Sequence, residues 1–111
     1  MHKHLVVTAT LSNPPKDPEY IKQWLRDLTQ LVNMEIFIEP VAKYCDDPNN
    51  AGVTGAIVIT TSHASVHIWD HGLFQADLYS CKDYDEATVV DFMINSFKLG
   101  MVKYQVIDRS I

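Results

Sequence analysis

Residues 63–80 read HASVHIWDHGLFQADLYS, two strand-like runs on either side of a short polar segment. Successive side chains of a strand point to opposite faces, so each run should present one apolar and one polar face. The apolar face carries Ala64, Val66, Ile68, Phe74, Ala76 and Leu78. The polar face carries His63, Ser65, His67, Trp69, Gln75, Asp77 and Tyr79. We therefore expect a hairpin whose apolar face meets the core and whose polar face is free of helices.

The three residues 70–72 form the predicted hairpin loop and set the register of the two strands. The expected cross-strand pairs are Trp69–Leu73, His67–Gln75, Ser65–Asp77, His63–Tyr79 and Thr61–Cys81. A slip of one residue would bury the histidines, which supports a register that keeps the two faces, whereas a slip of two residues would keep them as well. It brings Cys81 beside Ser62.

Outward from this hairpin, the chain alternates strand and helix signals. Asp17 is a predicted N-cap with Pro18 in the first helical position, and apolar residues follow at spacings of three and four: Ile21, Trp24, Leu25, Leu28, Leu31 and Val32. Asp85 caps a second predicted helix that stops at Gly100. The remaining predicted strands span 4–10, 34–42, 53–60 and 101–107, with an exposed loop at 45–50.

This order of elements predicts an α+β fold, a two-layer sandwich in which two helices pack on one face of a mostly antiparallel sheet. A chain of 111 residues is long enough for one core, so residues 1–111 should form a single domain.

The composition excludes several classes of protein. With a net charge of -5 and no cluster of Lys and Arg, the chain does not resemble a nucleic-acid binder. Its first residues contain no long apolar stretch, so we expect neither an export signal nor a membrane span, and a cytoplasmic location. Cys45 and Cys81 are then expected to be free thiols.

Two kinds of site find little support in the spacing of the residues. His63 and His67 lie about 13 Å apart on a strand, too far for one metal ion, and His2 and His4 lie close to the N-terminus. We therefore predict no metal site. A hydrolase triad of Ser62, His67 and Asp77 lacks the Gly-x-Ser-x-Gly turn that would support it.

Several segments at matched spacing resemble the bacterial and archaeal S-adenosylmethionine decarboxylase family. They are TSHASVHIW at 61–69, ADLYSC at 76–81, GVTG at 52–55 and HLV at 4–6. The family pattern has Glu-Ser-His, a further His and a Trp, then Asp-hydrophobic-aromatic-Thr/Ser-Cys, with Gly-Val-Ser-Gly upstream.

The resemblance implies self-cleavage between Thr61 and Ser62, which gives residues 1–61 and 62–111 and converts Ser62 into a pyruvoyl cofactor. It makes His67 the base for the elimination step, and Thr54 a second processing hydroxyl. Cys81 becomes the acid that reprotonates the substrate carbon. The substrate amine would form a Schiff base with the pyruvoyl ketone, which accepts electrons as carbon dioxide leaves.

The implied reaction converts S-adenosylmethionine into its decarboxylated form, the aminopropyl donor for spermidine and other polyamines. Trp69 and Asp70 would contact this small-molecule substrate, and the family's tendency to pair suggests a homodimer.

The chain departs from the family pattern at three places. Thr61 replaces Glu, the segment 69–71 is Trp-Asp-His instead of Trp-Pro-Glu, and Thr8 and Ala9 stand where the family tends to carry an acidic and an aromatic residue. Two alternatives follow. One keeps the cofactor but acts on arginine or ornithine, and the other is a homologue that is not cleaved and binds a ligand or partner without catalysis.

Overall fold

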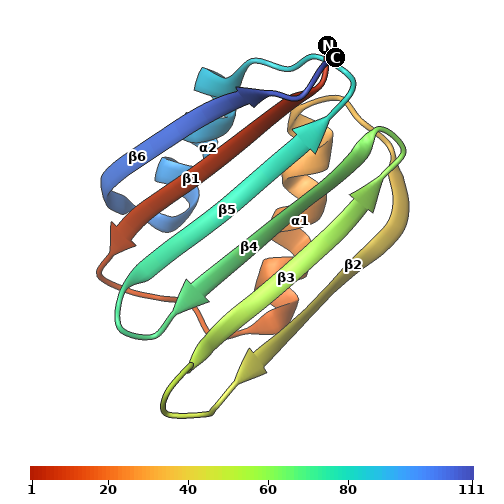
Figure 1. The fold of residues 1–111 in the computed structure, drawn as a ribbon. Helices are drawn as coiled ribbons and strands as arrows, with labels where there is room; N and C mark the ends of the chain where they lie inside the picture. The colour runs from red at the N-terminus through yellow and green to blue at the C-terminus, as the bar shows by residue number, and fades with distance from the viewer.

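The computed structural model describes all 111 residues as one α+β sandwich (Figure 1). Its elements are β1 (Lys3–Leu11), α1 (Pro18–Leu31), β2 (Ile36–Cys45), β3 (Gly52–Ile59), β4 (Ser62–Trp69), β5 (Leu73–Ser80), α2 (Glu86–Phe97) and β6 (Leu99–Asp108). The six strands form one sheet in the order β2-β3-β4-β5-β1-β6, and every neighbouring pair is antiparallel. Both helices lie on the same face, α1 against β2 and β3 and α2 against β1 and β6. The predicted fold class is confirmed.

The helix-covered face of the sheet is the core, as the alternation predicts. The six apolar residues of the hairpin are all buried: Ala64, Val66, Ile68, Phe74, Ala76 and Leu78. No helix covers the opposite face, which we call the open face. Its side chains stand in rows across the strands because the registers are aligned. The row nearest Ser62 is Val58–His63–Tyr79–His4–Ile107, the next is Ala56–Ser65–Asp77–Val6–Gln105, and the third is Thr54–His67–Gln75–Thr8–Lys103.

Helix α1 begins where the sequence predicts. The carboxylate of Asp17 accepts a hydrogen bond from the backbone N–H of Glu19 at 2.9 Å, and Pro18 is the first helical residue. The buried residues of α1 include Ile21, Trp24, Leu25 and Leu28. Leu31, expected in the core, is 40% exposed, whereas the next residue, Val32, packs against the core.

A glycine lets α1 approach the sheet. A Cβ atom at Gly55 in β3 would lie 2.6 Å from Cγ2 of Ile21 and 3.2 Å from Cδ1 of Leu25. The helix therefore packs directly on the backbone of β3, and a larger residue at position 55 would push it away. This contact fixes the strand that carries Thr54.

Helix α2 ends earlier than the sequence predicts. It is capped by Asp85 as expected, but its last helical residue is Phe97, and Lys98 takes the left-handed conformation with φ of 52°. Gly100, expected to stop the helix, belongs to β6. A Cβ atom at Gly100 would lie 2.8 Å from Oγ1 of Thr10. The absence of a side chain at Gly100 therefore lets β6 lie close to Thr10 in β1.

The strand expected at 34–42 is displaced toward the C-terminus. β2 runs to Cys45 because it pairs with β3 as far as the Cys45–Gly52 pair, which leaves residues 46–51 as the loop. Cys45 is half-buried and Cys81 exposed, and both are free. Neither helix is long and apolar enough to cross a membrane.

Tyr84 joins β1 and β5 at the end of the sheet near Ser62. Its hydroxyl donates to the carbonyl of Leu78 at 2.7 Å and accepts from the N–H of Leu5 at 3.2 Å, and burial raises its pKa to about 12. We expect Tyr84→Phe to lower the free energy of unfolding by about 1–3 kcal/mol, since buried backbone groups lose their partner. The measurement is urea unfolding at pH 8.

Tyr84 should also make the free energy of unfolding depend on pH. An unfolded tyrosine ionises near pH 10 and the folded one near 12, so the stability contributed by neutral Tyr84 is complete below pH 10 and is lost as the pH rises toward 12. The difference in unfolding free energy between wild type and Tyr84→Phe should therefore stay constant up to pH 10 and shrink between pH 10 and pH 12. A constant difference would contradict this assignment.

Candidate active site

The Thr61–Ser62 bond lies at a tight turn between β3 and β4. Ile59 pairs with Ser62, which leaves Thr60 and Thr61 as a two-residue loop. Two-residue hairpins favour turns with positive φ at the central residues, but neither threonine has it, and Ser62 instead has φ of 157°. The backbone at Ser62 therefore departs from regular strand geometry, a conformation that non-glycine residues seldom adopt.

The carbonyl oxygen of Thr61 accepts a hydrogen bond from the backbone N–H of Cys81 at 3.1 Å. The β4–β5 ladder follows the predicted register and ends at the Ser62–Ser80 pair, and this bond adds one step beyond it. The Thr61 side chain is also held, because its Oγ1 accepts from Ser80 Oγ at 2.9 Å and donates to the sulfur of Met34 at 3.4 Å. Cys81 thus lies beside the Thr61–Ser62 bond, as the sequence predicts.

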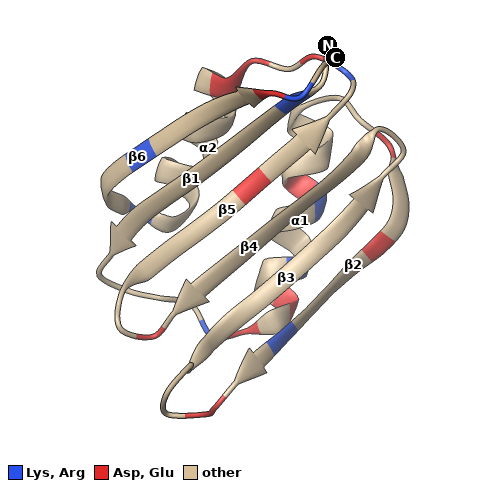
Figure 2. Ribbon diagram, viewed as in Figure 1, with Lys and Arg blue, Asp and Glu red and all other residues tan.

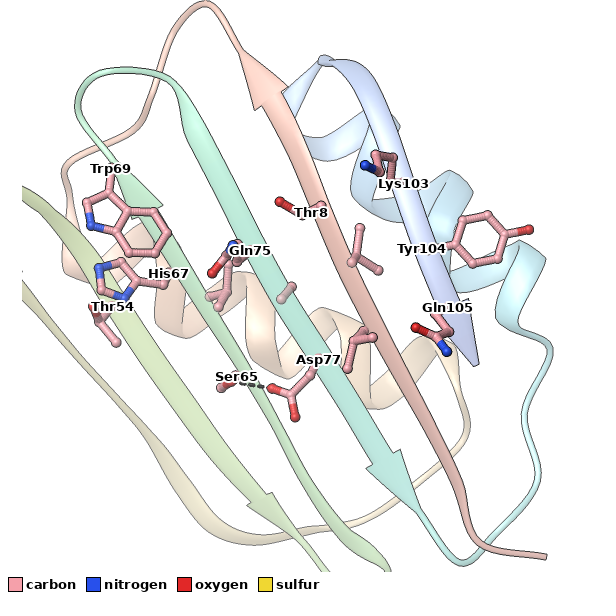
Figure 3. Close-up of a pocket in the computed structure, with 14 residues that line it drawn as sticks. Thr8, Thr54, Ser65, His67, Trp69, Gln75, Asp77, Lys103, Tyr104 and Gln105 are labelled. Atoms are coloured by element: carbon pink, nitrogen blue, oxygen red, sulfur yellow. Dashed lines mark hydrogen bonds between the residues drawn. The ribbon is translucent and has the colours of Figure 1, made fainter. Parts of the chain in front are cut away.

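A shallow pocket of about 640 Å³ occupies the middle of the open face (Figure 3). Thr54, His67 and Trp69 line one side of it, and Asp77 and Ser65 lie toward the end nearer Ser62. The other lining residues are Val6, Val7, Thr8, Val66, Gln75, Ala76, Lys103, Tyr104 and Gln105. This pocket gathers most of the predicted polar face of the hairpin.

His67 is packed against an aromatic ring in this pocket. Its ring stacks on Trp69 with centroids 3.7 Å apart and an angle of 11° between the planes, and Thr54 is its cross-strand neighbour. Partial burial lowers the pKa of His67 and so favours the neutral ring. A neutral imidazole can accept a proton, as a general base must.

The structure does not bring His67 to Ser62 within one chain. The two residues lie five positions apart on β4, about 16 Å along a strand, too far for direct contact. Thr54 is paired with His67 and is equally remote from Ser62. The predicted site residues thus fall into two groups, with Thr61, Ser62 and Cys81 at the end of the sheet and Thr54, His67 and Trp69 in the pocket.

Asp70 does not line the pocket. Its Oδ2 accepts a hydrogen bond from the hydroxyl of Tyr44 and lies 3.6 Å from Nζ of Lys16, while its Oδ1 is buried without a partner. Thr8 and Ala9, the two residues of β1 that differ from the family pattern, lie on opposite faces of the sheet. Thr8 lines the pocket, whereas Ala9 is buried on the core side, where an aromatic ring would not reach the open face.

Asp77 is the only charged residue in strands β3, β4 and β5, and it appears as the single acidic segment at the centre of the sheet (Figure 2). Its Oδ2 lies 2.7 Å from Nε2 of His4 and 3.5 Å from Nε2 of His63, and its Oδ1 accepts from Ser65 Oγ. His4 lies close to the N-terminus, but β1 pairs with strands on both sides, so His4 is held in place.

The three side chains of His4, His63 and Asp77 each offer one donor atom, all within 4.8 Å of one another. Two donors of a tetrahedral zinc ion, bound at about 2.0–2.1 Å, lie about 3.3 Å apart. The 2.7 Å between His4 and Asp77 is shorter than this and is a hydrogen-bond distance. His4 and Asp77 are therefore hydrogen-bonded in the present geometry, with His63 beside them.

Two parts of the site are absent from the sequence predictions. One is the contribution of β6 to the pocket through Lys103 and Gln105. The other is the contact of His4 with Asp77, which lies 73 positions away. Alternation along β1 and β6 is the only signal for these residues, and it says which face they share but not which strands they join.

The sequence and the fold match known proteins along nearly the whole chain. Residues 3–110 match the family model described as S-adenosylmethionine decarboxylase. The S-adenosylmethionine decarboxylase proenzyme of Pyrococcus furiosus is 30% identical over 112 residues, covering 97% of this chain and 78% of that protein. The proenzyme of Aquifex aeolicus is 36% identical over 62 residues, covering 54% and 46%.

A solved structure supports the fold. The crystal structure of the adenosylmethionine decarboxylase from Aquifex aeolicus superposes with a TM-score of 0.83 and covers 100% of this chain and 92% of that one. The sequence identity in this comparison is 23%, so it bears on the architecture alone.

Proposed function

The chain belongs to the S-adenosylmethionine decarboxylase family, and from this we propose that it cleaves itself between Thr61 and Ser62 and then decarboxylates S-adenosylmethionine. The product would be the aminopropyl donor for spermidine synthesis. Self-cleavage accords with the word proenzyme in the names of its relatives.

One observation carries the proposal for the cleavage site. The carbonyl of Thr61 is the group that a serine hydroxyl would attack, and the N–H of Cys81 already donates to its oxygen at 3.1 Å. A backbone donor in this place would stabilise the negative charge that develops on the oxygen during attack. The reacting group is the backbone carbonyl, so Thr61 in place of Glu does not remove it.

The surroundings of Ser62 fit the pyruvoyl group. Ser62 is half-exposed at a turn, so conversion of its side chain displaces no core residue. When formed, the group supplies a ketone that accepts electrons from the substrate during decarboxylation. We assign Cys81 as the acid that returns a proton to the substrate carbon, since its backbone adjoins the same bond.

The pocket on the open face is our candidate for the part of the substrate that does not react. Trp69 offers an aromatic surface, Gln75 an amide and Asp77 a carboxylate. S-adenosylmethionine has an aromatic base and positively charged sulfur and amino groups that such side chains can bind. Asp70, held by Tyr44 and Lys16 outside this pocket, would contact substrate only if it left these partners.

We propose a homodimer in which the open faces of two copies meet. Apolar side chains on this face are exposed, among them Val58, Met101 and Ile107, at 37%, 75% and 40%. His67 and Thr54 cannot reach Ser62 of their own chain, but they could serve Ser62 of the partner as base and second hydroxyl across such an interface. The pocket of one chain would then face the cleavage site of the other.

Intact mass under denaturing conditions, combined with carbon dioxide release, tests the function. We expect two fragments, residues 1–61 and residues 62–111, the second blocked by pyruvoyl, and release of carbon dioxide from S-adenosylmethionine but not from arginine or ornithine. A single species of 12.6 kDa after long incubation would support a homologue that is not processed. Cleavage combined with carbon dioxide release from arginine alone would support an enzyme that has the same cofactor but a different substrate.

If Cys81 is the acid, its replacement should stop decarboxylation without stopping self-cleavage. Cys81→Ala keeps the backbone N–H that faces Thr61 but loses the thiol, so cleavage should continue while decarboxylation falls by about 100-fold or more. Cys45→Ala, in β2, is the matched control and should retain full activity. Normal turnover by Cys81→Ala would remove Cys81 as the acid.

A further inference from the structure

A chain of polar contacts links Ser62 to a carboxylate. Ser62 Oγ lies 3.3 Å from Nδ1 of His63, although neighbouring side chains of a regular strand point to opposite faces. The other ring nitrogen of His63, Nε2, lies 3.5 Å from Oδ2 of Asp77. One imidazole thus stands between a hydroxyl and a carboxylate, the arrangement in which a histidine activates a serine.

The carboxylate at the end of this chain is fixed. Asp77 is flanked by His4, whose Nε2 is 2.7 Å from Oδ2, and by Ser65, which donates to Oδ1. The Asp77 side chain is 21% exposed and lies on central strand β5. No other charged residue lies on β3, β4 or β5. Asp77 is thus the one carboxylate on these three strands, and it faces His63.

We propose that His63 is the base that takes the proton from Ser62 in the first step of self-cleavage, with Asp77 and His4 as positioning residues. The inference rests on the proposed function, because it concerns the cleavage of the Thr61–Ser62 bond. It assigns a different histidine to each half of processing, with His63 forming the ester and His67 serving the later elimination.

The step balances without a co-reactant. The proton of Ser62 Oγ passes to Nδ1 of His63, and Oγ forms a bond to the carbonyl carbon of Thr61. The carbonyl oxygen takes the electron pair and keeps its hydrogen bond from Cys81 N–H. The bond between this carbon and the nitrogen of Ser62 then breaks, and that nitrogen takes the proton back from His63. The amide has become an ester.

Distance favours His63 over His67 for this step. The nitrogen of His63 is already near hydrogen-bond distance from Ser62 Oγ, whereas His67 lies about 16 Å away along the same strand. Because the side chain of His63 is 46% exposed, its replacement should not disturb the core.

The test follows cleavage in His63→Ala with and without added imidazole. We expect cleavage to slow by about 100-fold or more, with the Thr61–Ser62 bond remaining an amide that neutral hydroxylamine does not cut. Free imidazole should restore cleavage in proportion to its concentration, which a structural role for His63 would not allow. His71→Ala, an exposed histidine at the β4–β5 turn, is the control and should be cleaved like wild type.

Asp77→Asn provides a second test because it keeps the size of the side chain and removes the charge. It should slow ester formation by about tenfold or more and also leave an amide that hydroxylamine does not cut. An unchanged rate in this variant would remove Asp77 from the assignment.

The outcomes separate the inference from the function. Wild-type protein that never cleaves would defeat the proposed function itself. Cleavage of wild type and His63→Ala at similar rates would overturn only the role of His63. Accumulation of a hydroxylamine-sensitive ester in His63→Ala would also overturn it, since the variant would then be blocked after the step that we assign.

Discussion

Ser62→Ala should remain a single chain of about 12.6 kDa and release no carbon dioxide from S-adenosylmethionine. The hydroxyl of Ser62 is both the nucleophile of the proposed cleavage and the source of the cofactor, so its loss removes both activities at once. Ser62 is half-exposed at the start of β4, so the variant should fold as wild type does, which circular dichroism can check.

Two further variants test whether the expected loss is specific to the hydroxyl of Ser62. Ser12→Ala, at the exposed turn after β1, should cleave normally and controls for the loss of a hydroxyl elsewhere. Ser62→Cys keeps a nucleophile, and we expect it to form a thioester that hydroxylamine cuts at the same bond. Cleavage of Ser62→Ala at the 61/62 bond would falsify the proposed chemistry, because no group attached to residue 62 could then have attacked Thr61.

A mixture of two inactive chains should recover cleavage. His67→Ala and Ser62→Ala should each fail to mature alone. In a mixed dimer, however, Ser62 of the His67→Ala chain can meet intact His67 of its partner. The reason is the separation of about 16 Å between the two residues on β4, which leaves a second copy as the source of the base.

The experiment uses the two chains with different affinity tags and purifies dimers that carry both. We expect the His67→Ala chain of each mixed dimer to be cleaved and the Ser62→Ala chain to stay whole, as intact masses would show. Mixed dimers with both chains whole would contradict a shared site and return His67 to a role within its own chain. Failure to recover any mixed dimers would contradict the proposed homodimer.

The sequence predicts the central hairpin well because local alternation decides it. Every cross-strand pair from Trp69–Leu73 to His63–Tyr79 occurs as expected, and the contact of Cys81 with Thr61 follows from extending that register. The boundaries of the helices are predicted where a cap fixes them, at Asp17 and Asp85, but not at Lys98, where a non-glycine residue takes the left-handed conformation.

The parts of the site that the sequence could not predict depend on contacts between distant segments. His4 meets Asp77 only because β1 enters the sheet beside β5, and the order of strands does not follow the order of the chain. Asp70 likewise faces Tyr44 and Lys16, which precede it by 26 and 54 positions. No local pattern around Asp70 or His4 contains this information.

The strand order determines what would become of the two pieces after the proposed cleavage. Residues 1–61 contain β1, β2 and β3, and residues 62–111 contain β4, β5 and β6, yet β1 lies between β5 and β6. The fragments are therefore interwoven, since β1 pairs along its length with both strands of the other piece and β3 pairs with β4. Cleavage removes a covalent link at a surface turn and leaves every ladder intact, so the pieces should travel together through native purification as one particle, and only denaturation should reveal that there are two.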